Sequence, residues 1–299
     1  EMERKGYNRA FAAAITAGGS LVTPIIPPGI ALIIYGLVAD VSIGKMFIAG
    51  LVPGLLCAVV LMFTVYLVAR KTNAKPSRES WPTGKEVVFS LGQAWPALFL
   101  IFAVVGGIRA NIFTPTEAGA VAVLIVLAIG FFIYREMRIS HVVKALGETA
   151  RATASVMLVI MASAALGWIF SMEHAGVAVA NFVTSLTENK YMFLLIINIL
   201  LLTLGMFLEG NAILLILVPL LKPVVEHFGI DPVHFGIIMI FNLSIGAFTP
   251  PVGTVMLLVC NITQVSVGNF FKQSLPLLAA LLLMLMLVTY IPAISLFLV

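Results

Sequence analysis

Helix-breaking residues interrupt an apolar segment near the end of the chain, at 242–260, NLSIGAFTPPVGTVMLLVC. Pro250 and Pro251 lack the N–H donors that a helix needs, and they disfavour helix just before them. Gly246 and Gly253 let an unwound backbone bend and approach a ligand closely. The pattern predicts a broken helix, and the alternative is a proline kink that only shapes the bundle.

Oxygen atoms around this break suit a hard cation. The freed carbonyl groups and the hydroxyls of Ser244 and Thr249 are ligands that Na⁺ accepts. A half-helix that begins near Thr254 would direct its positive end at the same region and favour an anionic substrate group. We therefore expect an ion site beside an anion site.

A similar stretch, GGSLVTPIIPPGIALIIYG, occurs near the start of the chain. Its candidate loop residues are Gly18, Gly19, Ser20, Thr23, Pro27, Pro28 and Gly29. A shift of 224 residues brings VSIGKMF (41–47) onto VSVGNFF (265–271), and it also aligns Ser20 with Ser244. The recurrence of the break in both halves favours a functional break over a simple kink.

Glu209 is a carboxylate between two long apolar arms, at GMFLEGNA. An ionisable residue at membrane depth is costly and indicates function. It could bind Na⁺, hydrogen-bond the opposite loop or contact the substrate; alternatively, it could cap the returning arm near Gly210 and Asn211. Asn211 and Asn242 are better suited to fixing the two loops against each other than to direct chemistry.

The composition places these residues in an integral membrane protein. Of 299 residues, 61% are hydrophobic and 10% are charged, and the mean hydropathy is +1.13. A soluble domain carries about 25% charged residues. Cys57 and Cys260 lie in apolar runs and look like core residues rather than a disulfide. Only Glu209 is both deep and ionisable, which argues against an enzyme.

Apolar runs predict spans at 46–69, 87–108, 117–134, 152–170 and 274–298. If the basic loop at 70–86 is cytoplasmic, thirteen of the 17 lysines and arginines lie on that side. This count requires the segment at 190–226 to enter and leave from the outside. Its arms of about 15 residues reach roughly 22 Å, so we predict a re-entrant hairpin; the alternative is two short tilted spans.

The two broken segments, at 8–36 and 235–262, then run in opposite directions across the membrane. Similar sequence in opposite orientation indicates inverted-topology repeats. The predicted fold is an all-α membrane protein, an inverted-repeat secondary transporter of the ion-transporter-like kind. Residues 1–69 end the first repeat, 70–86 form the cytoplasmic loop, and 87–299 form the second repeat.

The chain resembles the large membrane subunit of the tripartite ATP-independent periplasmic (TRAP) transporters, closest to the sialic-acid systems. The resemblance runs from end to end and is carried by IPPGIALIIYG with SIGKMFIAGLVPGLL, by FTPTEAGA, and by GIDPVHFGI leading into TPPVGTVMLLV. FTPTEAGA also has a structural explanation, because Thr114 and Glu117 can form a capping box around Pro115.

The resemblance implies a sodium-coupled importer of a carboxylate such as sialic acid, which works by an elevator motion in the bacterial inner membrane. It implies no cofactor beyond sodium as coupling ion, and two partners: a small membrane subunit, fused in some members, and a periplasmic substrate-binding protein. The candidate sodium ligands are Ser20, Thr23, Pro27, Gly29, Gly210, Gly246, Thr249, Pro250 and Gly253. The residues expected near the substrate are Glu209, Asn211, Asn242, Ser244 and Thr254.

The family has two hairpins, and only the second is present in this sequence, so we expect a C-terminal portion of a longer polypeptide. Two other functions stay open. One is a related carboxylate transporter that works without a binding protein, and the other is an ion channel, because hairpins and unwound carbonyls also build filters.

Overall fold

The computed structural model describes residues 2–71, 83–110, 112–173 and 175–299, and the regular structure within them is helical. The helices are η1 (Glu3–Lys5), α1 (Arg9–Ser20), α2 (Ile30–Ala39), α3 (Ile43–Lys71), α4 (Gly84–Arg109), α5 (Pro115–Ala128), η2 (Ile129–Ile133), α6 (Ile139–Met172), α7 (Ala175–Leu186), α8 (Lys190–Phe207), α9 (Gly210–His227), α10 (Pro232–Phe248), α11 (Thr254–Thr263), α12 (Val267–Tyr290) and α13 (Ala293–Leu296). The chain divides into two compact units: unit 1 is Glu1–Ser77 with Ser163–Val299, and unit 2 is Arg78–Ala162.

Membrane-spanning helices dominate the described residues. Six are long and apolar enough to cross a bilayer, namely α3, α5 with η2, α6, α8, α9 and α12. The helix α4 would make a seventh, but its parts Gly84–Pro96 and Leu98–Arg109 meet at 57°. Pro96 lies at this bend, as expected of a proline inside a helix. The last apolar run, expected over 274–298, is α12, which ends at Tyr290 and is followed by the short α13.

The helix α10 forms the centre of unit 1. Every residue from Val233 to Gly246 is buried, and α10 packs against α2, α3, α8, α9, α11, α12 and α13. The sequence PVHFGIIMIFNLSIGAF explains this position, because it is apolar on all sides and a uniformly apolar helix must be buried or face lipid.

Two helix triplets in unit 1, α1–α2–α3 and α10–α11–α12, share some of their boundaries. At the shift of 224 residues, α2 (Ile30–Ala39) coincides with α11 (Thr254–Thr263), and the first residues of α3 and α12 also coincide. Each short helix ends in a left-handed residue, Asp40 with φ 59° and Gln264 with φ 54°. The caps correspond too, since Asn8 caps α1 and Asp231 caps α10 through side-chain oxygens. The short helices and the starts of the helices that follow them therefore coincide at the shift found in the sequence.

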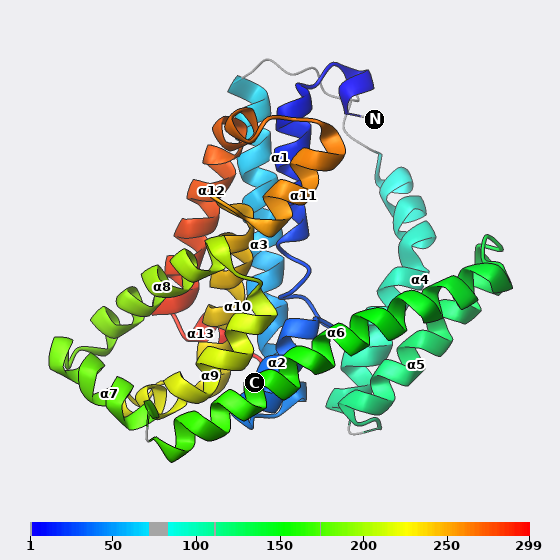
Figure 1. Cartoon of the computed structure of the whole chain (residues 1–299). Helices are drawn as coiled ribbons and strands as arrows, with labels where there is room; N and C mark the ends of the chain where they lie inside the picture. The colour runs from blue at the N-terminus through cyan, green and yellow to red at the C-terminus, as the bar shows by residue number, and fades with distance from the viewer. Residues whose placement is uncertain (1, 72–82, 111, 174) are drawn as a thin grey trace. The chain divides into compact units, whose positions relative to one another are not determined.

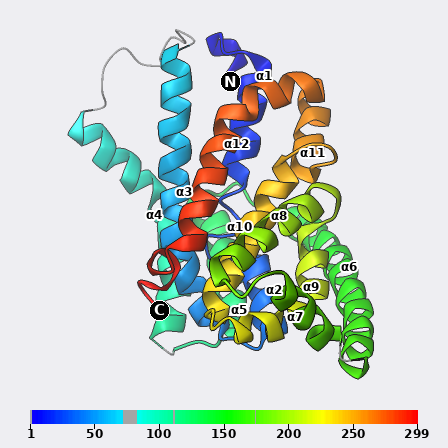
Figure 2. The same cartoon turned by 90° about the vertical axis from the view of Figure 1, so that its left-hand side faces the viewer.

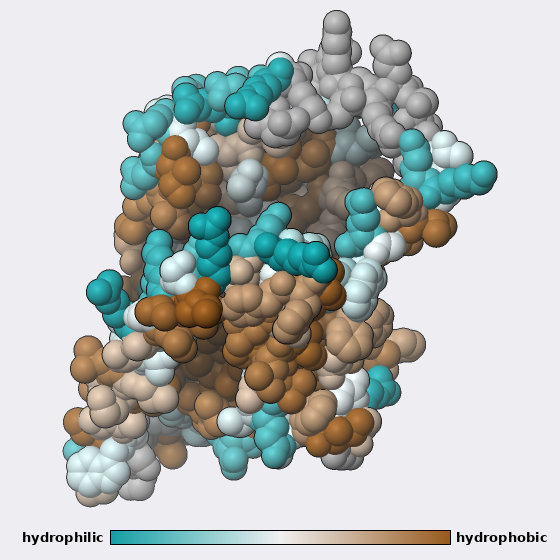
Figure 3. All heavy atoms as spheres, turned by 90° about the vertical axis from the view of Figure 1, so that its right-hand side faces the viewer, coloured by the Kyte–Doolittle hydropathy of each residue, from teal (hydrophilic) through white to brown (hydrophobic). Residues whose placement is uncertain are grey.

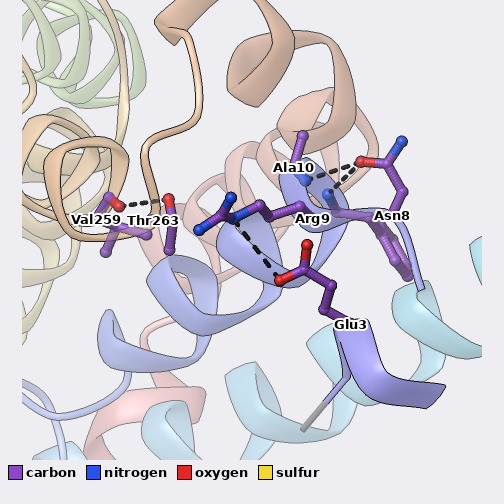
Figure 4. A network of polar contacts seen from close by, with 7 residues as sticks. Glu3, Asn8, Arg9, Ala10, Val259 and Thr263 are labelled. Atoms are coloured by element: carbon purple, nitrogen blue, oxygen red, sulfur yellow. Dashed lines mark hydrogen bonds and ion pairs between the residues drawn. The ribbon is translucent and has the colours of Figure 1, made fainter. Parts of the chain in front are cut away.

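The two triplets run in opposite directions. The helix α1 packs against α11, α2 packs against α10, and α3 packs against α12. Figures 1 and 2 show the start of α1 beside the α11–α12 turn at the top of unit 1, with α2 and the start of α10 toward the bottom. Figure 4 shows this upper end closely: Asn8 Oδ1 accepts from the amide of Ala10 at 2.8 Å, and Thr263 donates to Val259 O at 2.6 Å.

A helical hairpin made of α8 and α9 lies along α10. The helix α8 approaches the break between α10 and α11, and α9 returns toward α7, against which it packs (Figure 1). Each arm has 18 residues, or about 27 Å, which is longer than the 15 or so expected from sequence. Pro219 and Pro223 lie within α9 and do not end it. Arm length alone therefore does not exclude two crossings.

Unit 2 contains α4, α5, η2 and the first part of α6. Thr114 and Glu117 form the predicted capping box, with the Thr114 amide donating to Glu117 Oε2 at 2.7 Å. Only 6% of the apolar window of α5 and of α6 is buried, against 44% for α3. Figure 3 shows extended brown apolar areas on the face that it presents, with teal hydrophilic residues in groups between and above them.

Candidate ion and substrate site

The break between α10 and α11 is a tight loop whose two ends lie close together. Thr249 ends α10 with φ −103° and ψ 137°, and its amide donates to Gly246 O at 3.0 Å. The backbone then turns so that Gly253, with φ +36°, begins α11. A Cβ at Gly253 would lie 2.6 Å from Thr249 O and 3.1 Å from Ala247 O. Only glycine fits here, and two carbonyl oxygens converge at this point.

The end of α8 docks directly onto this break. The amide of Gly253 donates to Met206 O at 2.9 Å. At the residue before Met206 the backbones of α8 and α10 touch, because a Cβ at Gly246 would lie 2.6 Å from the carbonyl carbon of Gly205. At the hairpin tip, a Cβ at Gly210 would lie 3.5 Å from Leu243 Cβ. The structure therefore brings Gly210, Gly246 and Gly253 together, three of the predicted site residues.

Glu209 caps α9. Its Oε2 accepts from the amide of Ala212 at 2.9 Å, and its Oε1 accepts from Asn211 Nδ2 at 2.7 Å. The side chain is exposed at the tip. Of the two interpretations that the sequence left open, these contacts are those of a helix cap.

The hydroxyls at the break keep their acceptor capacity. Thr249 Oγ1 donates to Ile245 O at 2.7 Å, and Ser244 Oγ donates to Ile240 O at 2.8 Å. Both side chains are buried. Because each proton is used within α10, the lone pairs of each oxygen stay available. Thr254, at the first position of α11, is exposed.

The first break is a separate group of residues. Ser20 Oγ donates to Ala17 O at 2.7 Å, and Ser20 and Thr23 are exposed, whereas Pro27 is buried. Gly29 begins α2, and a Cβ there would lie 2.4 Å from Pro24 O. Gly50 of α3 approaches as closely, because its Cβ would lie 2.2 Å from Ile25 O. Glycines thus hold this loop against α2 and α3.

Asn242 lies inside the unit and does not bond Asn211. It is fully buried, and its Nδ2 donates to Asn198 Oδ1 at 2.8 Å and to Asn198 O at 2.9 Å. Asn198 Nδ2 in turn donates to Thr289 Oγ1 at 3.0 Å. Sequence reasoning missed Asn198 and Thr289. The available signal was an amide in the apolar run FLLIINILLLTL, whose partners no local pattern could identify.

His234, near the start of α10, is also buried. It is 2% exposed, with Nδ1 at 2.6 Å from Ser295 Oγ and Nε2 at 3.3 Å from Thr289 O. Among the described residues, no three His, Cys, Asp or Glu side chains gather to hold a metal. The oxygen ligands available at the breaks are therefore carbonyls and hydroxyls.

Comparison with known proteins identifies the family. The family model for the tripartite ATP-independent periplasmic transporter, DctM component, matches residues 1–294. The chain is 40% identical to the C4-dicarboxylate TRAP transporter large permease protein DctM of Pseudomonas aeruginosa, over 99% of this chain and 69% of that protein. It is 39% identical to the sialic acid TRAP transporter large permease protein SiaM of Vibrio cholerae, over 98% and 68%.

A third relative is the isethionate TRAP transporter permease protein DctMQ of Oleidesulfovibrio alaskensis, which is 38% identical over 99% of this chain and 46% of that protein. The printed substrates differ among these relatives, so the family does not fix the substrate. The chain belongs to the DctM large permease family of bacterial TRAP transporters, and it is a multi-pass membrane permease rather than an enzyme.

Proposed function

We propose that this chain forms the membrane permease of a sodium-coupled transporter, which imports a carboxylate delivered by a periplasmic protein. The observation that carries this proposal is the docking of α8 on the broken backbone, where the amide of Gly253 bonds Met206 O. Broken backbone among membrane helices is tolerated where it is buried in protein or lines a site. A closed loop held by a hairpin tip meets that condition.

Sodium would bind at the two breaks. At the second break the ligands are backbone carbonyls around Gly246, Pro250 and Gly253, with Thr249 Oγ1 and the backbone at Gly210. Thr249 donates its proton to Ile245 O, so the lone pairs of its oxygen would be available to a cation. Ser20 has the same arrangement at the first break, donating to Ala17 O. The matching ligands there are Ser20, Thr23, Pro27 and Gly29.

The carboxylate of the substrate would approach the N-terminus of α11. No described side chain caps this end, whereas Glu209 caps the nearby N-terminus of α9. Free amides and the helix dipole favour an anion, and a capping carboxylate opposes one. Thr254, exposed at the start of α11, would contact the substrate, with Ser244, Asn211 and Asn242 in support.

A re-entrant hairpin and an elevator motion fit this site. The helices α8 and α10 run in the same direction and end together, since Asn198 pairs with Asn242 and Gly205 with Gly246. The helix α11 then continues the broken segment beyond the hairpin tip. These relations support a tip that stops at mid-depth, and the antiparallel triplets support inverted repeats that alternate access.

Two substrates are to be compared. Sialic acid is the candidate that the sequence resemblance favours, and a C4-dicarboxylate is the second, because relatives of 39% and 40% identity are named for these two substrates. A tripartite transporter implies a small membrane subunit and a periplasmic binding protein as partners. The small subunit is either separate or fused to the large one.

The test is uptake of labelled sialic acid or C4-dicarboxylate by proteoliposomes that hold the complete polypeptide and the small subunit. We expect uptake only with an inward sodium gradient and with the cognate binding protein. Sodium-driven uptake without the binding protein would favour the stand-alone transporter. Single-channel currents in a planar bilayer would favour the channel. Uptake that ignores sodium would contradict the proposal.

A further inference from the structure

A chain of side-chain hydrogen bonds joins three helices inside unit 1. Asn242 of α10 donates to Asn198 of α8 twice, at 2.8 and 2.9 Å, and Asn198 donates to Thr289 of α12 at 3.0 Å. The three residues are at most 3% exposed. Asn198 is the middle member, and it contacts both neighbouring helices. A second hydrogen bond joins α8 to α12 at the start of α8, where the Tyr290 hydroxyl donates to Tyr191 O at 3.2 Å.

Among the described residues, Asn198 makes the side-chain hydrogen bonds between α8 and α10. The buried apolar side chains of α8 are Phe193, Leu194, Ile197 and Leu201, and the crossing with α10 is made by Gly205 and Gly246 without side chains. Contacts between apolar side chains are not directional, and the glycine contact has no side chains that interlock, so neither specifies one position of α8 along α10. In lipid there is little hydrophobic drive between helices, so interhelical hydrogen bonds contribute specificity. A single buried asparagine can fix the register of packed helices.

We propose that Asn198 is a positioning residue, which sets the register of α8 on α10 and thereby places Met206 O opposite the amide of Gly253. Asn198 lies about two helical turns before Met206 on the same rigid helix. A slip of α8 by one residue moves its backbone by about 1.5 Å, which breaks the bond of 2.9 Å between Met206 and Gly253. Asn198 therefore acts on the break without touching it.

The hydrogen bonding of Asn242 supports a geometric role. Asn242 is fully buried, yet its Oδ1 accepts no hydrogen bond from the described residues. A buried acceptor left unpaired opposes folding, so this pair is a poor device for stability alone. Its double contact from Nδ2 to both oxygens of Asn198 is specific in direction and position. Such geometry defines register.

The first test measures hydrogen–deuterium exchange of the peptide that covers residues 249–257, which contains the Gly253 amide. The sample is the full polypeptide with its small subunit in lipid nanodiscs. We expect Asn198→Leu to speed exchange of the Gly253 amide by about tenfold, since it would lose its acceptor. The double variant Asn198→Leu/Asn242→Leu should exchange as fast. It removes both asparagines, so Thr289 Oγ1 is the one polar atom of this network that loses its partner.

A matched control lies on the same helix. Thr203 is exposed and donates to Ile199 O within α8 at 2.7 Å, so Thr203→Val removes a hydroxyl without touching another helix. We expect it to exchange like the wild type. Thr289→Val removes only the α12 bond, and we expect a smaller change than for Asn198→Leu. Wild-type exchange in the double variant, or in Thr289→Val should the leucine variants not fold, would overturn the proposal.

A second readout rests on the proposed function. In sodium-driven uptake we expect Asn198→Leu to raise the sodium concentration for half-maximal rate by about threefold to tenfold, with the maximal rate kept. A merely structural role would lower the amount of active protein and leave that concentration unchanged. If the wild type needs no sodium, the proposed function fails, while the exchange experiment still decides the role of Asn198.

Discussion

Glu209 shows at the residue scale how a carboxylate at a hairpin tip is used. One carboxylate oxygen accepts from the Ala212 amide and the other accepts from the Asn211 side chain. Both oxygens are therefore used at the start of α9, as in a helix cap. The cap satisfies an amide that would otherwise be unpaired at the start of α9. It also places negative charge at this helix end, which in the proposed function would favour the approach of an anion to α11 instead.

Replacing Glu209 tests this capping role. We expect Glu209→Gln to keep most sodium-driven uptake, because an amide oxygen can still accept from Ala212. Glu209→Ala should lower stability by about 1 kcal/mol and reduce uptake, through loss of the cap. The measurements are thermal unfolding and initial uptake rate. If Gln is as damaging as Ala, Glu209 has a direct role for its charge.

Residues with local roles could be predicted from sequence, and residues with distant partners could not. The capping box of Thr114 and Glu117 depends on neighbours three positions apart, so sequence alone predicted it. Asn242 was singled out, but its partner Asn198 lies 44 positions away on another helix. No local rule connects two such positions. The hydrogen bonds that Ser20 and Thr249 donate to carbonyls of their own helices could not be predicted either, because they depend on where each helix ends.

At the scale of elements, breaks were easier to predict than crossings. Prolines and glycines act on their own backbone, so the breaks near Pro27 and Pro250 followed from sequence, and so did the match of α2 with α11. The crossing of α8 and α10 depends on two glycines from distant segments. The bend of 57° in α4 was not predicted either, because the run 87–108 reads as one apolar span.

The glycine crossing makes a prediction for α8 and α10. In Gly246→Ala the new Cβ would lie 2.6 Å from the Gly205 carbonyl carbon, so the helices must separate. We expect a loss of about 1–3 kcal/mol in stability and a strong loss of uptake. Gly268→Ala in α12 is the control, because its Cβ would meet nothing within 4 Å. Equal behaviour of the two variants in thermal unfolding and uptake would contradict the crossing.

At the scale of the whole molecule, unit 1 contains two helix triplets whose helices run in opposite directions (Figures 1 and 2). The triplets α1–α2–α3 and α10–α11–α12 each contain a break, and each break has a hydroxyl that donates to its own helix. In unit 2, α5 and α6 bury only 6% of their apolar windows within this chain. Such apolar surface requires lipid or another membrane subunit around it. This surface agrees with a permease that works within a larger assembly.

Two breaks predict more than one sodium ion per transport cycle. We expect the initial uptake rate to rise with sodium concentration with a Hill coefficient above about 1, because both sites must fill. Ser20→Ala and Thr249→Val should each lower that coefficient, since each weakens a different site. A hyperbolic sodium dependence in the wild type would limit the coupling ion to one break.

The most direct test of the central claim, that sodium binds at the break between α10 and α11, is uptake against sodium concentration for Thr249 variants. Valine keeps the shape of threonine and removes the oxygen, whereas Thr249→Ser keeps the oxygen. We predict that Thr249→Val raises the half-maximal sodium concentration about tenfold, the effect of about 1.4 kcal/mol, while Thr249→Ser stays close to the wild type. An unchanged sodium dependence in Thr249→Val would contradict the claim.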